Sequence, residues 1–179
     1  QKFMKEKGLG DNHELQTFFN IKLEKILARY GKSLMGWEEI MTKNMPKTAL
    51  NNTWKGDNEG MEPGESLIKA VKNGYQTIIS NGYYIDLMLS VEDHYLVDPM
   101  PLVALTAEEA TRILGGEATM WIVLVTPLTV DSRIWPRTSA IAERFWSARS
   151  VADVDDMFRR LEVISNSMEL MGLRHLQSR

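Results

Sequence analysis

Large aromatic side chains stand beside carboxylates at several places in this chain. Trp37 is followed by two glutamates, residues 83–86 read Tyr-Tyr-Ile-Asp, and Trp54 and Trp121 follow or lie within other apolar segments. The apolar C–H faces of a pyranose ring stack on indole, and its hydroxyls donate hydrogen bonds to carboxylates. One such aromatic alone is more often part of a packed core. Their recurrence after successive apolar segments predicts an aromatic-walled sugar pocket.

The elements that must position these residues alternate along the chain. Short apolar runs predict strands at 33–37, 47–54, 75–80 and 115–125. Helical periodicity between and after them predicts helices at 12–30, 65–73, 105–114 and 133–148, with a last helix from Met157 to Met171. This alternation favours a parallel α/β sheet, in which working groups lie at the carboxyl ends of the strands. Four such units amount to half of a (β/α)8 barrel.

Terminal signals support several of these helices. Asp11 or Asn12 is placed to cap the helix over 12–30, and Gly31 is placed to end it. Thr106 is a predicted cap for the helix over 105–114, and Pro136 suits the first turn of the helix over 133–148. The last helix carries an apolar stripe that requires a packing partner: Met157, Leu161, Ile164, Met168 and Met171.

Composition narrows the class of protein. The 179 residues have a formal net charge of −3 with mixed signs, which argues against a nucleic-acid partner. The chain contains no cysteine and no long apolar run, so neither a thiolate metal site nor a membrane span is expected. The first ten residues resemble the end of one helix and a turn. We therefore expect residues 1–179 to be a single segment of a longer protein.

Other chemistry has little support in the sequence. The histidines His13, His94 and His175 lack metal-ligand spacing, so we expect them at the solvated surface and predict no metal or cofactor. No G-x-S-x-G motif indicates a serine nucleophile. A group of charged residues near the carboxyl end could bind an anion, but structural ion pairs are the favoured interpretation, with Glu117 as a candidate partner: Arg133, Arg137, Glu143 and Arg144.

Five motifs occur in the order and spacing of one enzyme family. They are GWEE (36–39), NTW (52–54), GYYID (82–86), GGEATMW (115–121) and SRIWPRTSAIAERFWS (132–147). Together they resemble the family 20 glycoside hydrolases, the β-N-acetylhexosaminidases. The resemblance covers nearly the whole chain. It implies a partial TIM barrel made of strands five to eight, their helices and the C-terminal helices.

The resemblance also implies roles for individual residues. Trp37, Trp54 and Trp121 match the three tryptophans that wall the −1 sugar pocket of the family. Tyr84 matches the tyrosine that hydrogen-bonds the acetamido carbonyl oxygen, and Asp86 matches a carboxylate that holds sugar hydroxyls. Glu39 matches the glutamate of a Trp-x-Glu motif, which we expect to support the pocket from behind.

The implied reaction is retaining hydrolysis assisted by the substrate. The acetamido oxygen attacks the anomeric carbon, so the protein supplies no nucleophile. An adjacent Asp-Glu pair does the proton work in the family, and no Asp-Glu dipeptide occurs in this chain. We therefore expect no catalytic residue within the segment, and no activity of the segment alone. The implied substrate is a glycan ending in N-acetylhexosamine, or a chitooligosaccharide.

One departure from the family pattern concerns the end of the pocket. The family follows its last pocket tryptophan with a small residue and a glutamate that binds sugar hydroxyls, whereas this chain has Ile122 and Val123. A sugar hydroxyl buried without a partner costs about 1–3 kcal/mol. The sequence therefore leaves open a second reading, a degenerate relative that binds amino sugars or is structural. It also leaves the preference for gluco or galacto substrates undecided.

Two further expectations follow from the resemblance. Half a barrel would expose raw sheet edges, so the isolated segment should self-associate, misfold or pair with its missing N-terminal half. A periplasmic or secreted location is favoured by the family alone.

Overall fold

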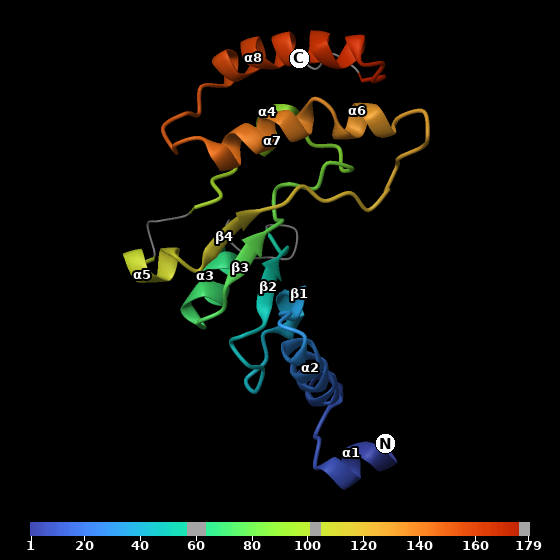
Figure 1. Ribbon diagram of the computed structural model, residues 1–179, viewed down its shortest axis with the longest axis vertical. Helices are drawn as coiled ribbons and strands as arrows, with labels where there is room; N and C mark the ends of the chain where they lie inside the picture. The colour runs from blue at the N-terminus through green and yellow to red at the C-terminus, as the bar shows by residue number, and fades with distance from the viewer. Residues whose placement is uncertain (57–63, 101–104, 176–179) are drawn as a thin grey trace. The chain divides into compact units, whose positions relative to one another are not determined.

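The computed structural model describes residues 1–56, 64–100 and 105–175 of the chain (Figure 1). The chain divides into two compact units. The first comprises residues 1–79 and the described part of 101–114, and the second comprises 80–100 and the described part of 115–179. Each unit is described below by itself.

A four-stranded sheet with the order β1-β2-β3-β4 organises the structure. The strands β1 and β2 are parallel, with Trp37 opposite Asn52, and β2 and β3 are parallel, with Asn52 opposite Ile78. Along the edge of β3, the Thr77 N–H donates to the Arg112 carbonyl at 2.9 Å. The strands are β1 (Met35–Trp37), β2 (Leu50–Thr53), β3 (Thr77–Ile79) and β4 (Ile113–Gly116).

The second helix of the first unit begins and ends at its predicted signals. The carboxylate of Asp11 accepts from the Glu14 N–H at 2.8 Å and so caps the second helix, while Gly31 adopts a left-handed φ of 64° just beyond its end. Buried Ile40, Met45 and Ala49 form the core near this helix. The elements are α1 (Lys2–Lys7), α2 (Asn12–Arg29), η1 (Glu38–Ile40), α3 (Glu65–Lys72) and α5 (Ala107–Ala110).

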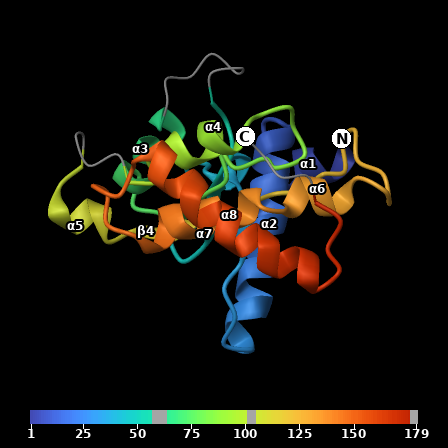
Figure 2. The same cartoon turned by 90° about the horizontal axis from the view of Figure 1, so that it is seen from above.

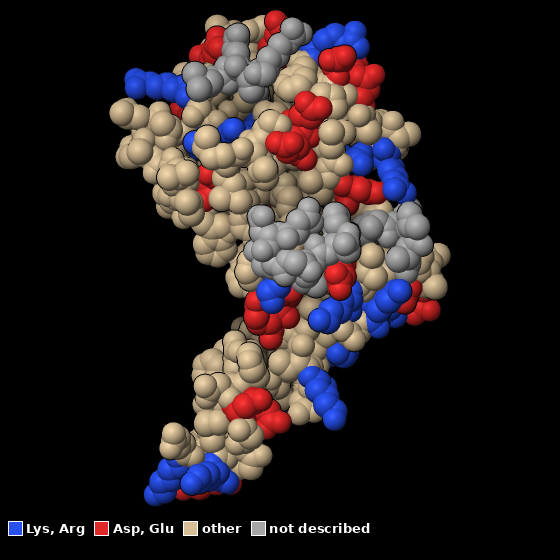
Figure 3. Space-filling model, turned by 180° about the vertical axis from the view of Figure 1, so that it is seen from behind, with Lys and Arg blue, Asp and Glu red and all other residues tan. Residues whose placement is uncertain are grey.

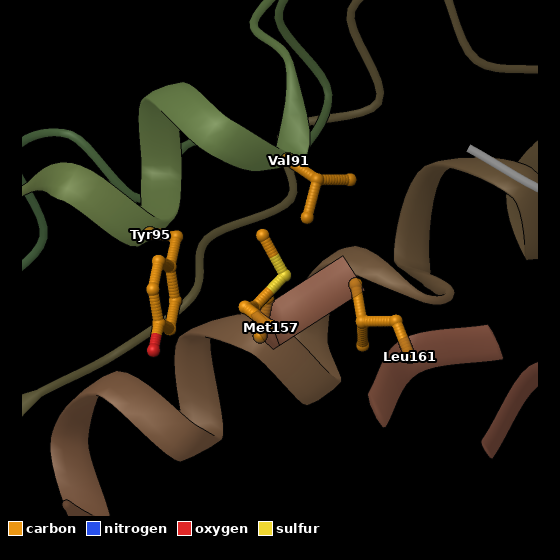
Figure 4. Packing of buried hydrophobic residues seen from close by; sticks show 5 residues of the cluster. Val91, Tyr95, Met157 and Leu161 are labelled. Carbon is orange, nitrogen blue, oxygen red and sulfur yellow. The ribbon is translucent and has the colours of Figure 1, made fainter. Parts of the chain in front are cut away.

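The second unit is built mainly from helices that share one core. Figure 4 shows Val91 and Tyr95 from one of these helices converging with Met157 and Leu161 from another. Burying each of these large side chains contributes roughly 1.5–3 kcal/mol to the stability of the unit. The helices are α4 (Val91–Leu96), α6 (Val130–Ile134), α7 (Arg137–Trp146) and α8 (Val154–Leu170), and α8 runs alongside α7 in Figures 1 and 2.

The apolar stripe of α8 is only partly buried. Met157, Leu161 and Met168 lie in the interior, whereas Ile164 and Met171 are exposed. The buried face instead includes Ser165, because residues 157, 161, 165 and 168 keep one side of a helix with 3.6 residues per turn.

Several predicted boundaries are wrong. The helix expected over 105–114 ends at Ala110, because Ile113 and Leu114 already belong to β4. The strand expected over 115–125 ends at Gly116. The helix expected over 133–148 is two helices, α6 and α7, which meet at Trp135 and Pro136.

The helix α4 (Val91–Leu96) is not among the predicted helices, although Ser90 and Asp93 form a reciprocal capping box at its start.

Acidic and basic side chains are interspersed on the face drawn in Figure 3. Among the described residues, no helix combines the length and the apolar character that crossing a membrane requires.

Candidate functional site

In the first unit, the candidate residues follow the ends of two neighbouring parallel strands. Trp37 is the last residue of β1, and Trp54 follows the last residue of β2. Gly36 precedes Trp37 at a close approach: a Cβ there would lie 2.8 Å from Cδ1 of Ile40, so a larger residue would require the Ile40 side chain of η1 to shift. The parallel register brings the chain after β1 beside the chain after β2.

The side chain of Glu38 fixes the backbone of the second segment. Its Oε2 accepts hydrogen bonds from the backbone N–H groups of Trp54 at 3.3 Å and Lys55 at 3.1 Å, and from Ser66 Oγ at 2.6 Å. Only 7% of this side chain is exposed. Sequence reasoning missed Glu38, because nothing in two consecutive glutamates shows which one turns inward.

Glu39 contacts the side chains of the same two residues. Both of its carboxylate oxygens lie 3.3 Å from Nε1 of Trp54, and Lys55 Nζ lies 3.0 Å from Oε1. Burial raises the pKa of Glu39, but its backbone hydrogen bond and its contacts with Lys55 and Trp54 outweigh this and lower it. The hydrogen bond to Glu39 raises the pKa of Lys55. Glu39 therefore stands behind Trp54, where it restrains the indole ring.

In the second unit, the segment containing Tyr84 pairs with the segment that follows β4. Tyr84 forms a parallel bridge with Thr119, the Ile85 N–H donates to the Thr119 carbonyl at 3.0 Å, and the Thr119 N–H donates to the Tyr83 carbonyl at 2.9 Å. This pairing places Asp86 beside Trp121.

Asp86 is fully buried, and its two oxygens have different surroundings. Oδ2 accepts from the backbone N–H groups of Trp121 at 2.9 Å and Val123 at 3.0 Å. Oδ1 is also buried and has no hydrogen-bond partner among the residues that the structure describes. A buried carboxylate oxygen left without a donor is costly, so this atom is suited to accept a hydrogen bond from a ligand hydroxyl.

The residues after Trp121 form an irregular loop in place of the predicted strand. Ile122 and Leu124 have left-handed φ values of 65° and 58°, which cost a β-branched or bulky residue energy. Ile122 is 68% exposed and Leu124 is 70% exposed. Val123 lies between them, also exposed, and offers no polar side-chain atom beside Asp86.

Two of the charged residues expected to form ion pairs do so. Glu143 pairs with Arg160 at 2.6 Å, and Arg144 lies 3.9 Å from Asp98, which confirms the structural interpretation for these two residues.

The remaining members of that charged group make other contacts. Arg137 donates to the Ser132 carbonyl at 3.0 Å, and Arg133 lies 3.5 Å from the sulfur of Met88. Glu117 accepts from Ser80 Oγ at 2.9 Å.

The prediction that the histidines are solvated is wrong for two of them. His94 and His175 are buried. The ring Nδ1 of His94 lies 2.6 Å from the Gly82 carbonyl oxygen, and burial lowers the pKa of His94. His175 contacts Ser165 through Nε2. Within the described ranges, no group of three or more His, Cys, Asp or Glu side chains is arranged to hold a metal ion.

The candidate residues thus fall into two groups. Trp37, Glu39 and Trp54 lie together in the first unit, and Tyr84, Asp86 and Trp121 lie together in the second.

The fold that carries these residues is found in known proteins. The family model described as glycosyl hydrolase family 20, catalytic domain, matches residues 1–149. The chain belongs to this family. The predicted resemblance is confirmed, and the family 20 chain has the predicted α/β fold of a partial TIM barrel.

Known proteins of similar sequence and structure support the assignment to this family. The chitobiase of Flavobacterium johnsoniae is 58% identical with a TM-score of 0.92, over 98% of this chain and 27% of its own. A Streptomyces plicatus β-hexosaminidase, solved with its product N-acetylglucosamine, is 26% identical with a TM-score of 0.75, over 95% of this chain and 37% of its own. The human β-hexosaminidase subunit beta is 33% identical over 168 residues, which are 90% of this chain and 29% of its own length. This chain therefore spans less than a third of the length of the human relative.

Proposed function

We propose that this chain is the C-terminal half, residues 1–179, of the catalytic barrel of a β-N-acetylhexosaminidase. The parent protein would remove terminal N-acetylglucosamine or N-acetylgalactosamine from glycans or chitooligosaccharides by retaining, substrate-assisted hydrolysis. This segment would supply the aromatic wall of the −1 sugar pocket through Trp37, Trp54 and Trp121. Membership of family 20 supports the reaction class.

The observation that carries the proposal is the state of Asp86. One of its oxygens is committed to the protein by two backbone hydrogen bonds, and the other is buried without a partner among the described residues. A carboxylate held in this way presents a fixed acceptor to a sugar hydroxyl, and a hydrogen bond to a charged group contributes about 1.5–3 kcal/mol.

The aromatic residues would act on the acetamido group. Indole rings exclude water and hold that group beneath the sugar ring, which favours attack of its oxygen on the anomeric carbon. The C–O bond to the leaving group breaks as the new C–O bond forms, and a bicyclic oxazolinium ion results. Tyr84 would hydrogen-bond the acetamido oxygen, and groups outside this segment would protonate the leaving oxygen and activate the water.

The partners follow from this placement. The missing N-terminal half of the barrel would complete the site, and the isolated segment would self-associate, misfold or pair with that half. Sedimentation velocity of the isolated segment tests this, because a stable, soluble monomer would contradict it.

The loop at Ile122–Leu124 favours a second candidate. It presents exposed apolar side chains where a hydroxyl-binding group would serve catalysis, and Val123 has no acceptor. A non-catalytic relative that binds amino sugars, or has a structural role, fits this feature.

Turnover separates the two candidates. The full-length protein is incubated with an aryl N-acetyl-β-glucosaminide, and proton NMR follows the anomer that is released first. The hydrolase proposal predicts release of the β-anomer of N-acetylglucosamine. No turnover by a protein that carries an upstream Asp-Glu pair would favour the non-catalytic relative, and first release of the α-anomer would refute the retaining mechanism.

A further inference from the structure

Lys55 occupies a central place in the first unit's carboxylate cluster. Its ammonium lies 3.0 Å from Glu39 Oε1, 3.5 Å from Glu38 Oε1 and 5.6 Å from the centre of the Trp54 ring. Lys55 and Glu39 thus lie beside the indole of Trp54, and Glu38 bonds the backbone N–H of the same residue. Neither the motif that contains Trp54 nor the pocket described above assigns Lys55 a role.

The two glutamates would repel each other without this cation. Glu38 is anchored by three other donors and stays in place, whereas the Glu39 side chain is 41% exposed and is free to turn toward water. Its departure would remove the carboxylate that accepts the Trp54 Nε1–H. The backbone of Trp54 would remain fixed through Glu38, so only the orientation of the ring would change.

We infer that Lys55 is a positioning residue for the Trp54 side chain. It neutralises Glu38 and holds Glu39 against the indole N–H, while its own charge lies toward the ring. Lys55 touches no reacting atom in this arrangement. Its consequence for sugar binding rests on the proposed function, but its effect on the ring does not.

The chain offers a matched control for this lysine. Lys47 Nζ lies 3.7 Å from the centre of the Tyr75 ring in the same unit. That ring is buried in the core, and its hydroxyl donates to the Met45 carbonyl at 3.2 Å. Lys47→Met therefore removes a lysine from an aromatic ring without touching Trp54.

The direct test is fluorine NMR of the full-length protein labelled with 5-fluorotryptophan. Trp54→Phe assigns the Trp54 resonance. We expect Lys55→Met and Glu39→Gln to shift or broaden this resonance alike, and the double variant to add nothing, because both break one chain of contacts. Lys55→Arg should keep the resonance near its original position, and Lys47→Met should leave it unchanged. An unchanged Trp54 resonance in Lys55→Met, or additive shifts in the double variant, would overturn the inference.

Steady-state kinetics then test whether the position of the Trp54 ring affects sugar binding. Lys55→Met removes a partly exposed ion pair, and this loss is expected to raise KM for an aryl N-acetyl-β-glucosaminide about fivefold. The value of kcat should stay nearly constant, because the ring contacts the substrate before and during the reaction. A wild-type protein without turnover would count against the proposed function while the Trp54 resonance still decides the role of Lys55. A shifted resonance with unchanged KM would refute the link to sugar binding.

Discussion

Two buried carboxylates in this chain each accept hydrogen bonds from backbone N–H groups, but the surroundings of their second oxygens differ. Glu38 and Asp86 each accept the backbone N–H of a tryptophan that follows a strand, Trp54 in the first unit and Trp121 in the second. The second oxygen of Glu38 faces Lys55 at 3.5 Å. The second oxygen of Asp86 is buried without a partner in the described part of the chain.

The difference predicts a supporting role for Glu38 and a ligand-binding role for Asp86. Both oxygens of Glu38 already face protein donors, which suits a residue that holds structure. Asp86 keeps one acceptor unfilled at a buried position, which is costly unless a ligand supplies the donor. A buried acidic residue next to an aromatic wall can therefore be interpreted as structural or ligand-binding only when the hydrogen-bond partners of both its oxygens are known.

The largest expected effect is on the supporting carboxylate. Glu38→Ala leaves the N–H groups of Trp54 and Lys55 without their acceptor, and should lower the free energy of unfolding of the full-length protein by about 3 kcal/mol. Glu39→Ala, at a largely exposed side chain, should lower it by less than about 1 kcal/mol. Chemical denaturation measures both, and equal losses would erase the distinction between the two glutamates.

The next effect concerns Asp86, the predicted ligand-binding carboxylate. Asp86→Asn keeps a carbonyl oxygen for the Trp121 and Val123 N–H groups but replaces the unfilled acceptor with an amide donor. Affinity for N-acetylglucosamine should fall about 10- to 100-fold, with the free energy of unfolding changed by less than about 1 kcal/mol. Isothermal titration calorimetry gives the affinity.

Asp98→Asn is the control for this substitution. Asp98 is a partly buried carboxylate of the same unit that pairs with Arg149 at 2.8 Å, so its loss should leave the affinity unchanged. Unchanged affinity in Asp86→Asn would show that its second oxygen has no ligand.

A smaller effect tests how Asp86 holds its loop. Ile122 keeps a left-handed φ that costs an L-residue about 1–2 kcal/mol, and glycine relieves this at an entropic cost of about 0.5–1 kcal/mol. Ile122→Gly should therefore raise the free energy of unfolding by about 0.5–1 kcal/mol. Val125→Gly, without a left-handed φ, should lower it by a similar amount. A lower free energy of unfolding in both variants would contradict backbone strain at Ile122.

The smallest effect is a difference in pH dependence. The pKa of buried His94 is lowered in the folded second unit, so its contribution to stability is present above the unfolded value of about 6.5 and is lost as pH falls below it. The pKa of Glu39 is also lowered, and its contribution is lost only as pH falls below about 4.5. As pH falls from about 6.5 to about 4.5, amide protection factors, which correct for the intrinsic exchange rate, should fall around His94 and not around Glu39, and they should fall less in the His94→Gln variant. An equal fall of the protection factors in both segments would contradict the assignment.

The order of elements could be predicted because local signals determine it. Asp11 and Gly31 bound α2 as expected, and short apolar runs predicted three of the four strands within a few residues, whereas the fourth ends at Gly116 rather than at 125. The loop after Trp121 could not be predicted, because a run of aliphatic residues favours a strand until a distant carboxylate captures two of its N–H groups. The local sequence holds no sign of that contact.

The same limit applies to the site. Tryptophan and carboxylate types next to strand ends were enough to predict a sugar pocket and its candidate residues. The inward turn of Glu38 and the burial of His94 depend on tertiary packing, so neither could be read from neighbouring residues. The roles of the pocket residues remain predictions.

The most direct test of this account is a crystal structure of the full-length protein with N-acetylglucosamine bound. The account predicts a sugar hydroxyl about 2.7 Å from Asp86 Oδ1, the Trp54 ring against the sugar, and Glu38 bonded only to protein donors. A sugar bound elsewhere, or Asp86 Oδ1 paired with a protein donor while the sugar contacts Glu38, would contradict it.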